Sequence, residues 1–466
     1  MQNTKQATAG QDRIFILEKM PVNKAIWTLG LPTMAAMLIQ VIYNMTDTFY
    51  IGKLNDPNMV AGIVITMPIF FGFQACGNIF AAGGASLISR LLGRGERETA
   101  GRASAIAFWS ATVIFLIVTV IGLLFHRRIL LACGASPNTI GYATSYALVM
   151  FMGSPFVGLQ HALSGLLRSE GATKEAMIGM ISGSILNMIL DPIFIFGFGL
   201  GVAGAAIATV LSNIAGFCYY LAFYLRKKSL ISISPRKYRF DLSIYGEIFK
   251  IGIPASVGMV LMSLGFTLTN VVASGFGDNI VAANGVVMRI TNIAVMITMG
   301  LSQGCQPLMG YNYGAKKYNR LIAVIRRALT ISTVIGTAFT VIFYFLADTW
   351  IRVFINDPEV IYYGVRIIHA MIIALPIMGV QMVLMTMFQS LGKAIESLII
   401  SLGRQGLFYI PALFLFSSLW GFDGFRFSHP FGDIATTCLS VAFFFRLRRQ
   451  LFAAGETPKE EAAYNS

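Results

Sequence analysis

The sequence predicts an all-α integral membrane protein with twelve transmembrane helices, arranged as two six-helix bundles related by a parallel pseudo-two-fold repeat. Three observations carry this prediction: a shortage of charged residues, an uneven distribution of Lys and Arg over the connections, and an internal repeat. Of the 466 residues, 56% are hydrophobic and 12% are charged, whereas an ordinary soluble domain carries about 25% charged residues. This composition excludes a water-soluble globule.

Twelve apolar segments follow one another along the chain. A helix needs about 20 predominantly apolar residues to cross a bilayer, so the chain has room for about twelve crossings and their connections. The expected spans lie near residues 25–51, 58–88, 103–125, 139–163, 174–197, 202–225, 244–273, 280–309, 328–347, 360–389, 395–420 and 431–446.

The basic residues divide unequally between the two sides of the membrane. When the connections are assigned by alternation, 27 of the 35 Lys and Arg lie on one side and 5 on the other, with Arg289, Arg366 and Arg404 inside spans. Loops rich in Lys and Arg stay in the cytoplasm, so we expect both termini to be cytoplasmic. The net charge of +14 is therefore interpreted as a topology signal and not as evidence for nucleic acid.

The two halves of the sequence repeat each other. Ten residues of the second half, several of them Gly or Pro, recur 221 positions earlier, and near the start of each half the offset is 222. Each half holds six spans, so both copies run in the same direction, and transporters with parallel repeats bind substrate between them. A duplicated bundle without a cavity is the alternative.

This repeat predicts the domain organisation. The expected parts are a cytoplasmic N-terminal segment (1–24), an N-lobe of helices 1–6 (25–225), a cytoplasmic linker (226–243), a C-lobe of helices 7–12 (244–446) and a cytoplasmic tail (447–466).

Two carboxylates lie inside spans of the first half. A charged side chain at the centre of a bilayer costs about 2.5–3.5 kcal/mol on insertion scales, so a carboxylate there indicates function. With a rise of about 1.5 Å per residue, Asp47 in the first span, Asp191 in the fifth and Thr209 in the sixth are expected at comparable depth.

The polar residues that surround these acids have helical spacing. Tyr43 precedes Asp47 by four residues and Gln40 precedes it by seven. Asn187 precedes Asp191 by four residues. Each set therefore shares one face of a helix.

Pro192 follows Asp191 directly and modifies the backbone beside it. Because Pro has no N–H and clashes with the carbonyl four residues before it, we expect a bend and a free backbone oxygen there. Carboxylates, an amide, hydroxyls and such a carbonyl are hard oxygen ligands, suited to a proton or an alkali cation. The alternative is that the two acids only form a hydrogen bond across a helix interface.

The second half lacks these acids. At the repeat offsets, Thr269 corresponds to Asp47 and Ala412 to Asp191, so we expect the ionisable site in the first half alone. The candidates in the C-lobe spans are Arg289, Arg366, His369 and Arg404.

Most of these candidates have a structural interpretation. Arg366 and Arg404 are expected to extend to the membrane edges. His369 is either an interior histidine with its hydrogen bonds satisfied or a participant in proton handling. We expect Asp423, His429 and Asp433, which lie at or near the outer end of the last span, to be loop or cap residues.

Four segments resemble the multidrug and toxic compound extrusion (MATE) transporters, and among them the DinF-like and MepA-like bacterial branch. They are GLPTMAAMLIQVIYNMTDTFYIG at 30–52, GLLRSEGAT at 165–173, SILNMILDPIFIFGFGLGVAGAAIAT at 184–209 and QPLMGYNYGA at 306–315. The resemblance covers residues 20–450. It implies a V-shaped pair of six-helix bundles that exports lipophilic, often cationic compounds in exchange for H⁺ or Na⁺.

The resemblance also implies roles for individual residues. The family's cation-linked cluster, which would hold H⁺ or Na⁺, corresponds to Asp47, Asn187, Asp191 and Thr209, with Tyr43 beside it. The proline at which the first helix bends corresponds to Pro32. The cavity-lining positions correspond to Met37, Gln40, Gln160 and Met180.

We therefore expect a monomeric secondary antiporter for multidrug efflux in the plasma membrane of a bacterium. Its partners would be small amphipathic or cationic organic molecules and the bilayer, its coupling ion H⁺ or Na⁺, and it would need no other cofactor. One alternative is a flippase for lipid-linked oligosaccharides, for which an Arg-rich cavity would be expected. Another is a membrane enzyme or scaffold, but the spans contain no GxSxG or HExxH motif.

Overall fold

The structure is a computed structural model that describes residues 2–54 and 56–453, and every regular element in that part of the chain is helical. The expected all-α class is thereby confirmed. The longer elements are α1 (Gln2–Glu18), α2 (Val22–Gly52), α3 (Pro57–Gly93), α4 (Arg97–Ala132), α5 (Ile140–Ser169), α6 (Thr173–Pro192), α7 (Gly201–Leu225), α8 (Leu242–Ser274), α9 (Asp278–Gly314), α10 (Tyr318–Phe345), α12 (Pro358–Met371), α13 (Leu375–Ser390), α14 (Ala394–Leu402) and α15 (Ile410–Ala453). The shorter elements are α11 (Ala347–Arg352), the π-helices η1 (Ile193–Gly197) and η4 (Gly403–Tyr409), and the 3₁₀-helices η2 (Pro235–Lys237) and η3 (Ile372–Ala374).

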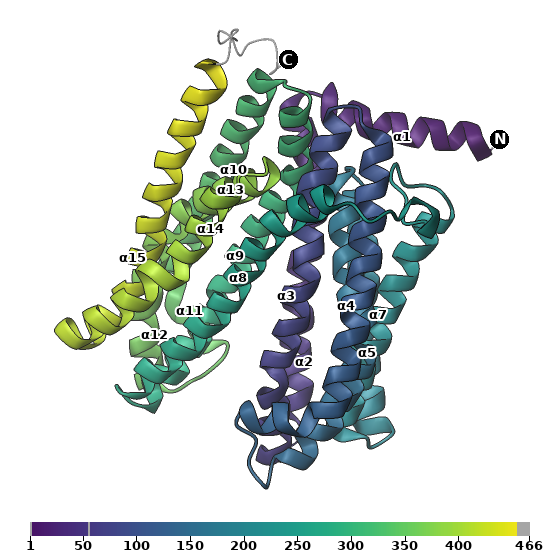
Figure 1. Cartoon of the computed structure of the whole chain (residues 1–466). Helices are drawn as coiled ribbons and strands as arrows, with labels where there is room; N and C mark the ends of the chain where they lie inside the picture. The colour runs from purple at the N-terminus through teal and green to yellow at the C-terminus, as the bar shows by residue number, and fades with distance from the viewer. Residues whose placement is uncertain (1, 55, 454–466) are drawn as a thin grey trace. The chain divides into compact units, whose positions relative to one another are not determined.

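Among the described residues, eleven helical stretches are long and apolar enough to cross a membrane. The last of them, Ala394–Leu451, has 58 residues, which is more than twice what one crossing needs. It folds back at Gly421, whose φ of 58° favours glycine. The two arms lie side by side, since the ring centroids of Phe416 and Phe431 are 5.0 Å apart (Figure 1). This stretch therefore makes two crossings, and the predicted number of twelve is confirmed.

The helices form two compact units that do not coincide with the lobes expected from the sequence. The N unit comprises the chain up to Lys19 and Leu38–Ser256, and the C unit comprises Met20–Met37 and the chain from Val257 onward. The expected boundaries assign α2 from residue 25 onward to the first lobe and α8 from residue 244 onward to the second. In the structure, the beginning of α2 belongs to the C unit and the beginning of α8 belongs to the N unit.

Close contacts at glycines explain this exchange of helix ends. In the C unit, a Cβ on Gly304 of α9 would lie 2.6 Å from the Cα of Gly30 in α2. In the N unit, a Cβ on Gly83 of α3 would lie 2.1 Å from the carbonyl oxygen of Ile248 in α8, and one on Gly252 would meet a backbone oxygen of α3 at 2.1 Å. Small residues allow helix backbones to approach in this way. Gly30 corresponds to Gly252, and Gly83 to Gly304, so both copies of the repeat use the same contact.

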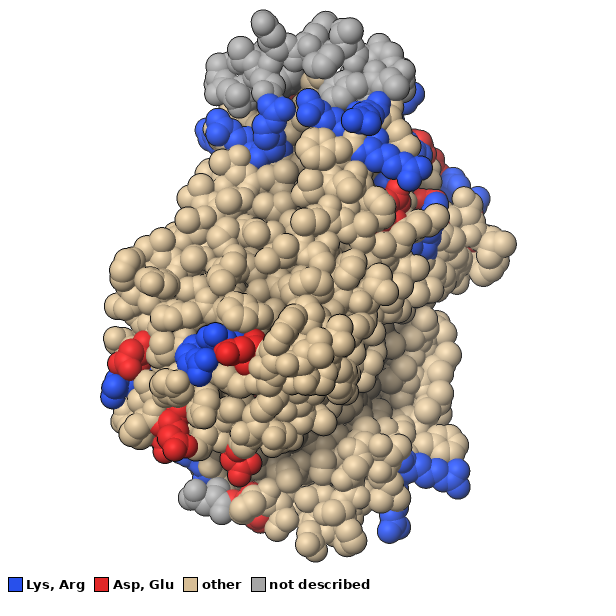
Figure 2. Space-filling view, turned by 90° about the vertical axis from the view of Figure 1, so that its left-hand side faces the viewer, with Lys and Arg blue, Asp and Glu red and all other residues tan. Residues whose placement is uncertain are grey.

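The surface has the charge distribution of a membrane-spanning protein. On the face that Figure 2 shows, Lys and Arg gather at one end, acidic and basic residues share the other end, and a wide belt between them has almost no charge. Large apolar side chains remain exposed, among them Leu124 at 71%, Leu225 at 71% and Phe345 at 77%. Exposed apolar surface of this extent indicates contact with lipid.

The helix α1 is attached to the rest of the N unit by a buried carboxylate. The Glu170 side chain, in the loop between α5 and α6, pairs with Arg13 of α1 at 3.0 Å and has no exposed surface. Arg13 also lies 3.5 Å from Glu175. Glu170 accepts further hydrogen bonds from the Ser229 hydroxyl at 3.0 Å and from the Leu230 N–H, both in the segment between α7 and η2. Burial raises the pKa of Glu170 to about 7, while Arg13 and the hydrogen bonds act in the opposite direction.

Candidate ion-coupling site

The interior of the N unit contains a carboxylate at the end of α6. Asp191 has no exposed surface, and Asn187, one turn earlier, is 2% exposed. The neighbouring helix α7 comes close because Gly183 has no side chain; a Cβ there would lie 3.0 Å from the carbonyl oxygen of Ser212. After Pro192 the chain continues as the π-helix η1, since Pro has no N–H with which to continue the α-helical pattern. Short π-helices are rare and occur often at functional sites.

The side-chain amide of Asn187 connects Asp191 to α7. In the orientation in which both amide atoms have a partner, its nitrogen donates to Asp191 Oδ2 at 2.8 Å and its oxygen accepts from the backbone N–H of Thr209 at 3.1 Å. The Thr209 hydroxyl lies 3.4 Å from the same amide. The structure therefore brings together three of the residues that the sequence predicts for this site.

Asp47 of α2 and two tyrosines extend this group. Asp47 is half-buried, and its charge acts on Asp191. Tyr43, one turn before Asp47 in α2, interacts electrostatically with both carboxylates. Tyr146 of α5 also interacts with both carboxylates. Sequence reasoning misses Tyr146, because one of two Tyr in a span with further aromatic residues has no distinguishing pattern.

The cluster is acidic and consists of oxygen donors. No Lys or Arg in the described part of the chain forms an ion pair with Asp47 or Asp191. When both carboxylates are ionised, two negative charges share a region walled by apolar side chains, and each proton or small cation that binds there relieves their repulsion. Carboxylate, amide and hydroxyl oxygens are also the ligand types that alkali cations prefer over zinc or copper.

The residues predicted to line a substrate cavity do not all belong to one unit. Gln40, Gln160 and Met180 lie in the N unit, whereas Met37 lies in the C unit. Gln40 donates a hydrogen bond to the side chain one turn further along α2, at 3.2 Å, and Gln160 lies against a glycine of α7. The helix α2 is continuous through Pro32. A role of these residues in binding and a bend at Pro32 stay predictions.

In the C unit, three residues with ionisable side chains lie in the interior, and the expectation for them is wrong. Arg404 Nε lies 3.0 Å from Asp433 Oδ1, and His429 Nδ1 lies 3.3 Å from Asp433 Oδ2. The Asp433 side chain is only 3% exposed. Asp433 and His429 are therefore not loop or cap residues, and Arg404 does not extend to the membrane edge. The reason is the turn at Gly421, which starts the last helix about three turns before Asp433.

The other three candidates of the C unit lie at the surface or have local partners. Arg366 forms an ion pair with Asp423 at 2.9 Å and is one-third exposed, as expected for a residue at the membrane edge. His369 stacks on Tyr344, with ring centroids 4.9 Å apart, and its Nε2 lies 3.3 Å from the Tyr344 carbonyl oxygen. Arg289 is exposed.

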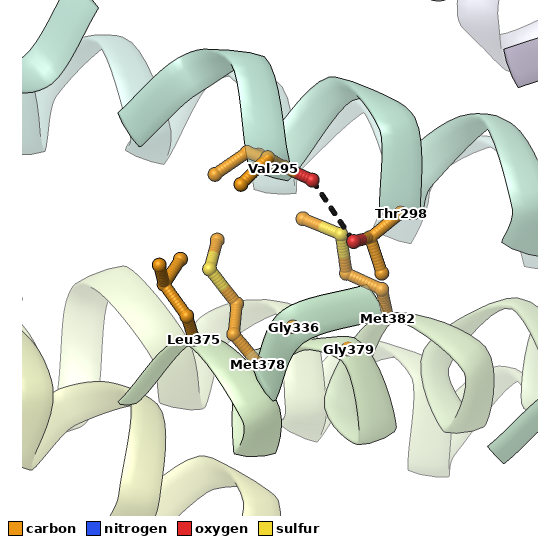
Figure 3. Close-up of a pocket in the computed structure, with 8 residues that line it drawn as sticks. Val295, Thr298, Gly336, Leu375, Met378, Gly379 and Met382 are labelled. Atoms are coloured by element: carbon orange, nitrogen blue, oxygen red, sulfur yellow. Dashed lines mark hydrogen bonds between the residues drawn. The ribbon is translucent and has the colours of Figure 1, made fainter. Parts of the chain in front are cut away.

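Two small cavities lie within the C unit. One lies between α9, α10 and α13 and is too narrow to hold a water molecule. Figure 3 shows Leu375, Met378 and Met382 directed towards Val295 and Thr298. The Thr298 hydroxyl donates to the carbonyl of its own helix at 2.9 Å, and the other lining side chains are apolar. The other has room for about one water molecule. It is lined partly by polar residues, among them Thr269, Asn284, Tyr409, Arg426 and His429.

The sequence matches a family model described as MatE twice, over residues 32–193 and 254–415. Together the two matches span more than half of the chain. Their offset of 222 residues agrees with the repeat predicted from the sequence.

Known proteins of two kinds are similar to this chain over nearly its whole length. The multidrug export protein MepA of Staphylococcus aureus (strain MSSA476) is 30% identical over 440 residues, which cover 94% of this chain and 97% of the relative. MepA of Staphylococcus haemolyticus (strain JCSC1435) is 31% identical with the same coverage. Among solved structures, an outward-facing multidrug resistance MATE family transporter of the MOP superfamily has a TM-score of 0.89 at 25% identity and covers 95% of this chain and 99% of its own. A MOP superfamily transporter from Pyrococcus furiosus has a TM-score of 0.88 at 25% identity with the same coverage.

Proposed function

Because the chain belongs to the MatE family of transporters, we propose that it is a secondary antiporter that exports lipophilic or cationic organic compounds in exchange for H⁺ or Na⁺. The chain is a multi-pass membrane transporter of small organic compounds and not an enzyme. The antiport, its coupling ion and the cationic character of the substrates are the proposed part. The observation that carries the proposal is the acidic cluster of the N unit.

This cluster favours a role in ion coupling over a structural role. A structural hydrogen bond between helices would be satisfied by one amide, without the cost of placing carboxylates in the membrane. Here Asp191 is fully buried, Asp47 acts on it electrostatically, and neither has a basic partner in the described part of the chain. Charges that are costly and unpaired are most simply explained if they bind and release a cation during the transport cycle.

We infer the following cycle from these charges. With Asp47 and Asp191 ionised, the N unit attracts a cationic substrate from the cytoplasm. Binding of H⁺ or Na⁺ from outside neutralises the carboxylates, lowers the affinity for the substrate and releases it outward. Such a switch requires an ion that binds one state more tightly than the other, and we assign the moving part to α2, through a bend near Pro32. Each charge that crosses the membrane contributes about 2.3 kcal/mol per 100 mV.

The N-unit cluster suits either coupling ion. A proton needs only the two carboxylates, whereas Na⁺ would take oxygen ligands from Asp47, Asn187, Asp191 and Thr209, with Tyr43 beside them. The substrate would contact Met37, Gln40, Gln160 and Met180. We further infer that the transporter is a monomer in a bacterial plasma membrane, with both termini in the cytoplasm, because the Lys and Arg of the connections are biased to that side.

The test is transport in proteoliposomes that hold either a pH gradient alone or a Na⁺ gradient alone. Uptake of a fluorescent organic cation should depend on one of the two gradients in the wild type. Asp47→Asn and Asp191→Asn should each reduce this gradient-driven transport at least tenfold, while the proteins insert and unfold at temperatures close to that of the wild type.

The matched control is Asp348→Asn. Asp348 forms an exposed pair with Arg352, so its loss should leave transport unchanged. Full gradient-driven transport by both Asp47→Asn and Asp191→Asn would refute the proposal.

A further inference from the structure

The C unit contains a row of three interacting side chains that the proposed cycle does not use. Arg404 of η4 donates from Nε to one oxygen of Asp433 at 3.0 Å, and His429 lies one turn before Asp433 with Nδ1 3.3 Å from the other oxygen. The Arg404, His429 and Asp433 side chains are 17%, 21% and 3% exposed. A buried carboxylate that has two partners of this kind is held in one orientation and orients both partners.

The contact with Asp433 determines which nitrogen of His429 carries the proton. An ionised carboxylate only accepts hydrogen bonds, and Nδ1 lies 3.3 Å from it, so the neutral ring is favoured with its proton on Nδ1. Nε2 is then left with a free lone pair, and a proton that binds there produces an imidazolium ion next to Asp433. The row thus changes from neutral to a charge of +1 in one step. Carboxylate–histidine pairs of this kind are a common arrangement for proton transfer.

The ring of His429 lines a small cavity in the C unit. The cavity has room for about one water molecule and is also lined by Thr269, Asn284, Tyr409 and Arg426. Asn284 is 1% exposed, and its Nδ2 and the Nε of Arg426 have no hydrogen-bond partner within the described part of the protein. Buried polar groups of this kind are normally satisfied by water in such a cavity. So small a space suits water and not the exported compound, because a drug-sized pocket measures about 300–1,000 Å³.

The neighbours of His429 add few other charges. On its own helix they are Asp433 and Arg426, and Arg426 shares the carboxylate of Asp423, at 2.9 Å, with Arg366. From η4 they are Arg404, through Asp433, and Tyr409, whose ring centroid is 5.0 Å away. The other cavity-lining residues from α8, α9 and α12 are uncharged: Thr269, Asn284, Met288, Ile367 and Met371.

Comparison with the N unit shows that the helices can pack without Arg404, Asp433 and His429. At the offset of 221, Arg404 corresponds to Gly183 and Asp433 to Ser212, and that pair also forms a close contact in the N unit. His429 corresponds to Ala208, which is fully buried. The N unit therefore packs the same crossing with small residues. The cavity itself lies at the place of the acidic cluster, since Thr269 corresponds to Asp47, and a π-helix borders the site in both units.

We propose that His429, oriented by Asp433 and Arg404, is a second proton-binding site, located in the C unit and separate from the acidic cluster of the N unit. Proton uptake on Nε2 adds a positive charge to the C unit and lowers its affinity for a cationic substrate, so substrate binding expels this proton. The inference rests on the proposed export of cations but not on the roles of Asp47 and Asp191.

The test counts protons released when tetraphenylphosphonium binds to the purified transporter in weakly buffered detergent, at a series of pH values. The double variant Asp47→Asn/Asp191→Asn should still release protons. Adding His429→Gln to it should abolish this remaining release, while tetraphenylphosphonium still binds. His429→Gln keeps a donor for Asp433, so the fold should be retained, and its melting temperature checks this.

The matched control is His369→Gln in the same double variant, because His369 is a second histidine of the C unit with its own partners. It should leave the remaining release unchanged. Asp433→Asn should make the release smaller at the same pH, which a merely structural role would not predict. If the double variant releases no protons, or releases equally many with His429→Gln, the second site is refuted. The proposed function fails instead if Asp47→Asn and Asp191→Asn transport fully, so the two failures are distinct.

Discussion

The N unit and the C unit are copies of one six-helix repeat, and they differ most in their polar interior. The N unit contains an acidic cluster around Asp191, whereas the C unit has Ala412 at that position and a row of Arg404, Asp433 and His429 on neighbouring elements. The glycines at the helix contacts match in both copies, because each copy must bring the same backbones together. A charged residue that takes part in function is needed in only one copy. The charged residues therefore differ between the copies, whereas the packing glycines match.

Among substitutions that test this difference between the units, we expect the largest effect from one that lowers the stability of the C unit. Arg404→Met leaves Asp433 buried without its cation, which costs about 3–5 kcal/mol of unfolding free energy. The N unit needs no such partner at Gly183. The measurement is the unfolding midpoint in detergent.

A double variant and an exposed pair serve as controls for Arg404→Met. Arg404→Met/Asp433→Leu should recover most of the loss, because no unpaired charge remains. Arg352→Met, which breaks the exposed pair with Asp348, should cost less than about 1 kcal/mol. Equal losses in Arg404→Met and the double variant would show that Arg404 acts through packing alone.

The next effect concerns Glu170, whose counterpart in the C unit is the buried Leu391. Because the pKa of Glu170 is raised from 4.5 to about 7 in the folded state, the folded protein binds the proton of Glu170 more tightly than the unfolded chain does. Its contribution to stability is present below about pH 4.5 and is lost as the pH rises to about 7, up to about 3 kcal/mol. Glu170→Gln should therefore flatten the pH dependence of unfolding in this range. Parallel curves for wild type and variant would contradict this, and Glu98→Gln, at an exposed position, is the control.

The smallest effect tests the glycine contacts shared by both units. Gly252→Ala places a Cβ 2.1 Å from a backbone oxygen of α3, and such overpacking typically costs about 1–3 kcal/mol. A Cβ on Gly246, in the same helix, would have no neighbouring atom within 4 Å, so Gly246→Ala should stabilise by up to about 1 kcal/mol. Thermal unfolding of both variants gives the comparison, and equal midpoints would mean that α8 is not closely packed at Gly252.

Most of the N-unit cluster was predictable because each of its residues carries a local signal. Asp47 and Asp191 stand out as acids within apolar spans, and Asn187 precedes Asp191 by one helical turn. Tyr146 carries no such signal, because only the packing of α5 places its hydroxyl near both carboxylates. The burial of Asp433 depends on the turn at Gly421, and hydropathy does not locate that turn within the long apolar stretch.

The sequence by itself determined the class, the twelve crossings, the repeat and the acids that charge makes costly in a membrane, because each of these depends on composition or on spacing along one helix. Tertiary structure alone decided that the first halves of α2 and α8 belong to the opposite units. It also decided that Arg404, Asp433 and His429 meet in the interior of the C unit. Contacts between helices depend on how backbones cross, and in this protein a few glycines without side chains set those crossings.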